Sequence, residues 1–356
     1  MKGPQVLEAG WDIEEIPQLR GSILEWIDAK RIVISRGSRL FSSRTFEDTF
    51  TEVAHFRLPF FRSIASNFLV LQRLLRLLYF NVIAVTEGDF FVSFDRQTGL
   101  LSLSDFQGIL TPTPSRILRN GIADHNGLSY FGEYISNSQR GPVHIWSVKV
   151  GKQAMRPMKA YSFSSGEIRH IHRVAVDPYT TDLWCMTGDL PNECKILKSS
   201  DTFSTIQTIG EGDESWRCIS PLFDDKSIFY ATDSERAVNS IYKIDRETLA
   251  REKLCDIDGP VYYSARINND FFFAVTAELC PSQLTPCATI WHFTKSNPHL
   301  PRRILSIPKD MFHKTLFLPG TISFPNGPGI IGDSLYFSGM GLAGANFQVF
   351  RLYRTN

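Results

Sequence analysis

Two histidines stand two residues apart at the start of an apolar segment, Ile168–Val176. Side chains two residues apart share one face of a β-strand, so we expect His170 and His172 to point the same way. Imidazoles titrate near neutral pH, which suits acid–base catalysis. Two other interpretations stay open: a hydrogen-bonded pair that lines a channel, and a metal site, which would need Asp189 or Glu193 as a third ligand. We expect neither a metal nor a cofactor.

Acidic residues follow four of the apolar, strand-like segments of the chain, at similar places: Glu133, Asp189, Asp233 and Glu278. If these segments are equivalent strands of a repeated fold, the four carboxylates would gather at one rim. The alternative for Asp189 and Asp233 is that each caps a turn through backbone amides.

Arginine and aromatic residues lie in neighbouring strand-like segments. Trp216 and Arg217 belong to Ser215–Ile219, and Tyr263 belongs to Tyr262–Arg266. A structural interpretation is open for each: Arg217 would pair with rim carboxylates, and Trp216 would lie in the core.

A pocket that combines these groups would suit a hydroxylated, anionic ligand such as a polysaccharide with uronic acid. A lyase would remove the C5 proton with a histidine or tyrosine while arginine neutralises the carboxylate. A hydrolase would place two carboxylates beside the glycosidic bond. The catalytic candidates are His170, His172, Asp189 and Tyr263. The candidates for substrate binding are Glu133, Arg217, Asp233, Glu278 and Trp216.

The fold that must position these residues is predicted by a weak internal repeat. A short β-type segment recurs at a spacing of about 50 residues, within the range of propeller blades. Its copies are Arg31–Ile34, Phe90–Phe94, Leu128–Phe131, Leu183–Met186, Ile228–Ala231, Phe271–Val275 and Leu335–Phe337. We therefore expect an all-β fold, a single β-propeller of about seven blades over residues 1–356. The strand upstream of each copy should be the innermost strand of its blade.

One turn carries a family resemblance. The sequence from Ser199 to Ile206 resembles a degenerate Asp-box, the S-x-D-x-G-x-T-W hairpin of sialidase-like (BNR-repeat) propellers of the kind associated with bacterial surface polysaccharides. It departs from that pattern at Phe203, in place of Gly, and at Ile206, in place of Trp. Asp-boxes are structural in that family, so the resemblance implies a propeller scaffold. The arginine and acid constellation of sialidases is not recognisable in order, and sialidase catalysis is not carried over.

One segment does not belong to a repeat of strands. Residues 53–86 contain four arginines but no lysine and no acid. Within an insertion at 57–82, Ser66–Phe80 predicts a helix capped by Ser66 or Asn67. At helical spacing one stripe would contain Arg62, Ser66, Arg73 and Arg76. The arginines interrupt any apolar run long enough to span a membrane. The helix could lie in a membrane interface, dock on a partner or second copy through Phe68–Phe80, or be buried across one end of the propeller.

Charge and cysteine usage limit the function further. The chain has 38 Lys and Arg against 37 Asp and Glu, a net charge of +1, which argues against a nucleic-acid partner. A Gly-rich phosphate loop and a dinucleotide fingerprint are absent from the sequence, which argues against nucleotide chemistry. The start of the chain has no apolar secretory signal, and the six cysteines form no CxxC pair. We expect reduced thiols and a cytoplasmic location. The alternative location is the membrane surface, as a peripheral protein. A disulfide between Cys280 and Cys287 is the alternative for an oxidising compartment.

Our leading hypothesis is a carbohydrate-directed propeller that binds or cleaves an acidic surface polysaccharide or its precursor. The alternative is a non-catalytic scaffold docked to a membrane or a protein partner. Whether the chain is an enzyme, a glycosidase or a polysaccharide lyase, stays open at this stage.

Overall fold

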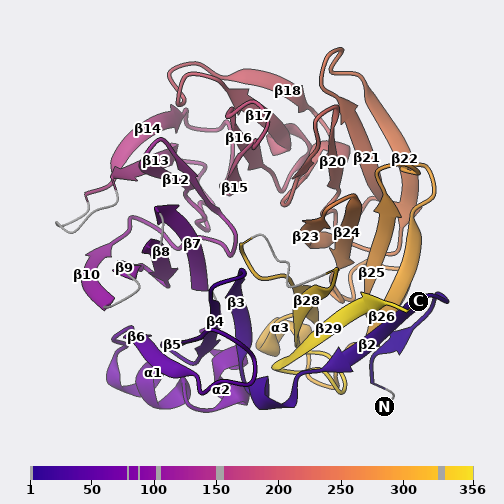
Figure 1. The fold of residues 1–356 in the computed structure, drawn as a ribbon. Helices are drawn as coiled ribbons and strands as arrows, with labels where there is room; N and C mark the ends of the chain where they lie inside the picture. Colours follow the sequence, from indigo (N-terminus) through magenta and orange to yellow (C-terminus); the bar gives the residue numbers. More distant parts are fainter. Residues whose placement is uncertain are drawn as a thin grey trace. The chain divides into compact units, whose positions relative to one another are not determined.

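The computed structural model is built almost entirely of strands and describes residues 3–77, 80–86, 89–101, 106–149, 156–327 and 333–355. Within these ranges the strands form seven sheets of four strands, one of which takes a fifth strand at its edge. The fold is a seven-bladed, all-β propeller, and Figure 1 labels strands from each of the seven sheets. The predicted fold class is therefore confirmed.

The chain divides into two compact units, the first made of residues 1–78, 233–243 and 252–356. One of its sheets has the order β3 (Ile23–Ile27), β4 (Ile32–Arg36), β5 (Arg39–Ser43), β6 (Thr51–His55). A second has the order β23 (Val261–Ile267), β24 (Asp270–Val275), β25 (Cys287–Thr294), β26 (Arg302–Pro308), β1 (Gln5–Val6). A third has the order β27 (Thr321–Ser323), β28 (Leu335–Met340), β29 (Gln348–Arg354), β2 (Trp11–Glu15). The helices α1 (Phe60–Ala65), α2 (Leu69–Leu74) and α3 (Lys314–Phe317) and the 3-10 turn η1 (Pro17–Leu19) also belong to this unit.

The second unit consists of residues 79–232 and 244–251. One of its sheets has the order β7 (Phe80–Thr86), β8 (Asp89–Phe94), β9 (Gln97–Leu101), β10 (Phe106–Pro112). Another has the order β11 (Ile122–His125), β12 (Leu128–Gly132), β13 (Val143–Lys149), β14 (Met158–Phe163). A third has the order β15 (Ile171–Val176), β16 (Leu183–Thr187), β17 (Lys195–Ser199), β18 (Gln207–Glu211). The remaining sheet of the chain has the order β19 (Leu222–Phe223), β20 (Ser227–Ala231), β21 (Asn239–Asp245), β22 (Arg251–Ile257). The 3-10 turns are η2 (Pro191–Glu193) and η3 (Glu214–Trp216).

The predicted repeat marks the second strand of every sheet. Its seven copies fall on β4, β8, β12, β16, β20, β24 and β28, and the strand upstream of each is the first of its sheet. These second strands are mostly apolar because both of their faces are covered along most of their length. All five residues of β16 are buried, whereas most of β14 is exposed or half-buried. A strand covered on both faces reads as a continuous apolar run, so it is the strand that a sequence reveals most clearly.

The two ends of the chain complete one sheet together. β2 pairs antiparallel with β29, from Trp11 opposite Arg354 to Glu15 opposite Phe350. The sheet β27–β28–β29 thereby gains its fourth strand from the N-terminal segment. The sequence repeat did not reveal this pairing, because the two strands are far apart in the chain.

The turn between β17 and β18 uses the Asp-box-like residues for backbone support. Asp201 accepts hydrogen bonds from the Thr205 amide at 2.8 Å and hydroxyl at 2.7 Å, and the Ser199 hydroxyl accepts one from the Phe203 amide at 2.8 Å. Phe203 has a φ of 70°, where the family pattern has glycine, but its buried ring packs near Tyr130 with centroids 5.9 Å apart. This packing offsets the strained backbone. The turn supports the scaffold, as the resemblance implies.

The predicted helical insertion is present but is not one continuous helix. It contains α1 and α2, separated by a break at residues 66–68. The predicted caps are wrong: Ser66 ends α1, and Phe68, with extended backbone and no side-chain cap, precedes α2. The buried Gln72 amide donates to the Ser66 carbonyl at 2.7 Å, so a side-chain hydrogen bond stabilises the break. Residues 78 and 79 of the predicted insertion lie outside the described residues, and residues 80–82 are part of β7.

All six cysteine side chains lie in the described ranges and are thiols rather than disulfides, as expected from the sequence. Among the described helices, none is long and apolar enough to cross a bilayer.

Candidate functional site

His170 directly precedes β15, His172 is its second residue, and the two side chains face one another. Their Nε2 atoms are 3.1 Å apart, and both side chains are buried. The β15–β16 register is shifted between Ile171, opposite Thr187, and Arg173, opposite Met186, which places a β-bulge at His172. Such bulges re-aim side chains next to functional sites. The two imidazoles therefore face each other, but the bulge at His172 interrupts the strand alternation from which a shared face was expected.

Asp189 joins the two histidines from the end of β16. Its Oδ1 lies 3.4 Å from Nε2 of His170 and 3.5 Å from Nε2 of His172. The φ of Asp189 is 141°, a region that non-glycine residues rarely adopt. Gly188, directly before it, leaves room for the neighbouring side chains: a Cβ atom there would lie 3.2 Å from both His172 Cε1 and Arg217 Cγ. The strained backbone of Asp189 and the missing side chain of Gly188 together allow the carboxylate to reach the imidazoles.

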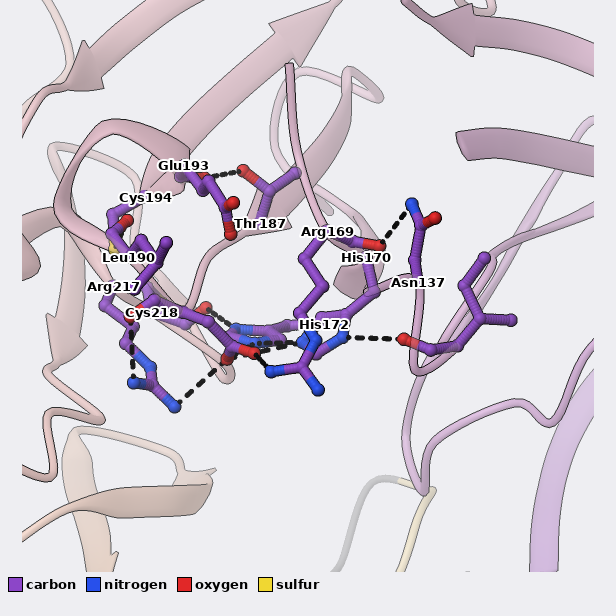
Figure 2. Close-up of polar contacts among 12 residues, drawn as sticks. Asn137, Arg169, His170, His172, Thr187, Leu190, Glu193, Cys194, Arg217 and Cys218 are labelled. Carbon is purple, nitrogen blue, oxygen red and sulfur yellow. Dashed lines mark hydrogen bonds and ion pairs between the residues drawn. The ribbon is translucent and has the colours of Figure 1, made fainter. Parts of the chain in front are cut away.

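Two arginines surround the carboxylate of Asp189. Arg169 donates from Nη1 to Oδ2 at 2.8 Å, and Arg217 Nη2 lies 3.3 Å from Oδ1. Figure 2 shows these side chains converging with the histidines. The predicted residues His170, His172, Asp189 and Arg217 therefore come together within one unit, and we call them, with Arg169, the imidazole cluster.

Backbone carbonyl groups orient both imidazole rings. His170 Nδ1 lies 3.2 Å from the Ile135 carbonyl oxygen, and His172 Nδ1 lies 3.4 Å from that of Cys218. The Tyr134 ring packs against His170, with centroids 4.3 Å apart. The loop after β12 and the loop after η3 thus hold the rings from two sides. Neither Tyr134 nor the two carbonyl groups could be assigned from residue type, because their part depends on loop positions.

Burial sets the protonation of this cluster. Desolvation lowers the pKa of His172 to about 4, against the opposing effect of Asp189. Burial by itself would raise the pKa of Asp189, but its contacts with His170 and His172 lower that pKa overall. Asp189 is therefore a carboxylate at neutral pH, and His172 is an uncharged imidazole.

Two of the predicted binding residues have other roles in the same unit. Glu133 is buried and accepts from the His144 amide and from Trp146 Nε1, both at 2.9 Å. Its own carbonyl accepts from the Ile171 amide at 2.9 Å, so Glu133 supports the start of β15 through its backbone. Trp216 packs under the Arg251 guanidinium, 3.7 Å from the ring centroid. These contacts are those of structural residues.

Three predicted site residues belong to the other unit. Tyr263 is buried in an apolar cluster with Phe272 and Ile307, which is the environment of a core residue. The neighbouring Tyr262 donates its hydroxyl to Glu278. Asp233 is buried. We therefore restrict the candidate site to the imidazole cluster.

A second candidate site lies on the helical insertion of the first unit. Its apolar side chains are exposed, and we call them the insertion surface: Phe60, Phe61, Ile64, Phe68, Val70, Leu74 and Leu75. Phe60 is 72% exposed and Phe61 is 82% exposed. The polar Gln72 and Arg73 of α2 are buried instead. This segment is therefore inverted relative to an ordinary surface helix, whose apolar face turns toward the core.

An ion pair holds the insertion in this orientation. Arg73 Nη1 donates to Asp310 Oδ2 at 2.6 Å, and its Nε donates to the Phe317 carbonyl at 3.1 Å. Lys309 Nζ contacts the other carboxylate oxygen of Asp310 at 2.5 Å. The predicted arginine stripe along one helix is wrong, because the break before α2 turns Arg73 inward while Arg76 is exposed.

Comparisons with known proteins show the fold but no family. No family model and no curated protein matches the chain. One similar solved structure is described as the mitotic checkpoint complex, with 10% identity, coverage of 97% of this chain and 93% of that one, and a TM-score of 0.54. The extracellular domain of a putative hybrid two-component system from B. thetaiotaomicron has 10% identity and a TM-score of 0.58. The match covers 100% of this chain and 40% of that one. YCF48 bound to a D1 peptide has 11% identity, full coverage of both chains and a TM-score of 0.54.

Proposed function

We propose that this protein is a non-catalytic binding propeller that docks on an anionic membrane surface through the insertion surface. The observation that carries this proposal is the inverted insertion, which exposes phenylalanine and leucine side chains and buries Gln72 and Arg73. A contiguous exposed apolar patch on a folded protein usually marks an interaction site. The structural neighbours are described as a checkpoint complex, the extracellular domain of a two-component system and a protein bound to a peptide, and at 10–11% identity they support the propeller fold alone.

The charge of the insertion favours a lipid surface. The exposed Arg76 lies next to Leu74 and Leu75 in the sequence, and residues 53–86 contain no acid that would repel anionic lipid. Basic residues next to such a surface contribute about 1 kcal/mol each. Phe60 and Phe61 project at the beginning of α1 and can enter the headgroup region as interfacial aromatics do. Because α1 and α2 have six residues each, they can lie on the bilayer but cannot cross it.

The carbohydrate hypothesis is the weaker one. Comparisons show a seven-bladed propeller without a feature specific to sialidases, glycosidases or lyases. The residues that were to form one acidic rim are partly used elsewhere, as Glu133 and Trp216 illustrate.

Co-flotation with lipid vesicles tests the proposal. We expect the protein to float with vesicles of phosphatidylcholine and phosphatidylserine, and to float less with phosphatidylcholine alone. Replacing Phe60 and Phe61 by Ser should weaken partitioning into the vesicles roughly 100-fold. About three quarters of each ring is exposed and could be buried in the lipid, so the two rings together would lose about 3 kcal/mol of burial energy. The matched control is Leu284→Ser, which removes a side chain that is 74% exposed outside the insertion. If wild-type protein ignores anionic vesicles, the membrane assignment fails and a protein partner becomes the occupant to test.

Electrostatics are tested separately. Arg76→Gln should weaken binding to anionic vesicles about fivefold, from the loss of about 1 kcal/mol, and leave binding to neutral vesicles unchanged. An equal loss on both kinds of vesicle would contradict a role for this charge.

A further inference from the structure

Three atoms with lone pairs face one another in the imidazole cluster. They are Nε2 of His170, Nε2 of His172 and Oδ1 of Asp189, with separations of 3.1, 3.4 and 3.5 Å. Each Nδ1 points at a backbone carbonyl oxygen, which only accepts hydrogen bonds. In a neutral ring with its proton on Nδ1, Nε2 carries a lone pair. In that tautomer both ring nitrogens and the carboxylate oxygen offer lone pairs to one point, so the three atoms can act as ligands of a common cation.

The spacing of these atoms fits a small tetrahedral ion. Zinc binds imidazole nitrogen and carboxylate oxygen at about 2.0–2.1 Å, so two ligands of a tetrahedral site lie about 3.3 Å apart. The three separations differ from that value by about 0.2 Å or less. Octahedral coordination with the same bond lengths would bring neighbouring ligands to about 2.9 Å. The triangle is therefore closer to one face of a tetrahedron.

We propose that His170, His172 and Asp189 form a tetrahedral site for a divalent transition-metal ion of the Zn²⁺ class, with one position left open. This site lies outside the insertion and does not depend on the proposed membrane docking. Structural zinc sites use protein ligands at all four positions, whereas a site with three protein ligands leaves the fourth to water or another small ligand.

The surroundings of the three ligands support this assignment. Metal-bound histidines donate their second ring nitrogen to a carbonyl or carboxylate, and both rings here have a carbonyl oxygen at that position. Metal-bound carboxylates are hydrogen-bonded in turn, and Arg169 occupies Oδ2, the oxygen of Asp189 that is not turned to the imidazoles. The strained backbone of Asp189 is typical of residues that a site holds in place.

The positive charge of Arg169 and Arg217 has a consequence for the open position. Both guanidinium groups contact Asp189, so a ligand of the bound ion would lie near fixed positive charge. An anionic oxygen ligand would satisfy both the ion and the arginines better than a neutral one.

Metal titration of the chelator-treated, full-length protein tests the site. We expect one equivalent of Zn²⁺ to bind, and Co²⁺ to bind at the same site with the intense visible bands of tetrahedral coordination. His172→Gln and Asp189→Asn should weaken Zn²⁺ binding at least 100-fold. His292→Gln is the matched control. His292 Nε2 also contacts an aspartate, Asp270 Oδ1 at 2.6 Å, but among the described residues no third possible ligand joins this pair. This variant should bind as the wild type does.

Each outcome decides the proposal. Wild-type protein without a stoichiometric Zn²⁺ or Co²⁺ site would overturn it, as would unchanged binding by the two ligand variants. A thiolate-to-cobalt charge-transfer band would also overturn it, because it would place the ion on a cysteine such as the nearby Cys194. Among the described residues the group of possible ligands consists of His170, His172 and Asp189 without a cysteine, so no such band is expected. Circular dichroism checks the fold of the variants, and if either is unfolded the wild-type cobalt spectrum decides alone.

Discussion

Removing the carboxylate of Asp310 should release the helical insertion from the propeller. The side chain of Arg73 is 1% exposed and that of Asp310 is 11% exposed, and Lys309, 3% exposed, contacts the same carboxylate. Asp310→Asn would therefore leave two buried cations without a counter-charge. Breaking a buried pair in this way costs about 3–5 kcal/mol. Arg73→Met should cost less, about 1–3 kcal/mol, because Lys309 still neutralises Asp310.

Amide hydrogen exchange of residues 60–77 measures this effect locally. A loss of 3 kcal/mol lowers the protection factors of these amides by about two orders of magnitude. Glu52→Gln is the control, since Glu52 forms an exposed pair with Arg39, worth about 0.2–1 kcal/mol. Protection in Asp310→Asn within threefold of wild type would refute the argument that this ion pair holds the insertion.

Three further results are expected. Burial raises the pKa of Asp310, but the contacts with Arg73 and Lys309 outweigh this effect and lower the pKa overall. The Asp310 carboxylate therefore stabilises the fold above the usual aspartate pKa, and this stabilisation is lost as the pH falls below about 4. Protection of residues 60–77, corrected for intrinsic exchange, should therefore fall below that pH in wild type but not in Asp310→Asn, and a loss already at pH 6 would contradict this. Gly188→Ala should weaken Zn²⁺ binding about tenfold while the circular dichroism spectrum stays unchanged, because the new Cβ presses on His172; undiminished affinity would speak against the tight packing. Asp201→Ala removes the hydrogen bonds of the β17–β18 turn and should cost about 1–2 kcal/mol in local exchange protection, whereas an unaffected hairpin would show that the Asp-box-like turn is dispensable.

The fold could be predicted because propeller blades repeat a doubly covered strand. Each second strand is apolar at nearly every position, so its seven copies stand out in the sequence. The closing pair of β2 and β29 could not be predicted, because pairing between distant segments leaves no local pattern.

The imidazole cluster was predicted in part. Strand alternation predicted that His170 and His172 lie together, and the equivalence of strand ends predicted Asp189 nearby; the β-bulge at His172, which helps to bring the imidazoles together, could not be predicted. Glu133 has the same position in its own repeat, yet Trp146 and the His144 amide take up its carboxylate. Sequence position alone does not say which neighbour satisfies a buried acid.

The insertion shows a second limit of sequence patterns. Apolar periodicity predicted a helix whose arginines share a stripe, but the pattern does not tell which face is turned inward. The pairing of Arg73 with Asp310, 237 residues away, reverses the ordinary orientation. A long-range ion pair of this kind is invisible to local reasoning.

Quenching by brominated lipids tests the central claim most directly. Phe61→Trp places a fluorophore on the insertion surface, and Leu284→Trp places one at the exposed control position. On anionic vesicles with bromine in the acyl chains, we predict that the fluorescence added at position 61 is quenched and that the fluorescence added at position 284 is not. Equal quenching at both positions, or none at position 61, would contradict docking through the insertion surface.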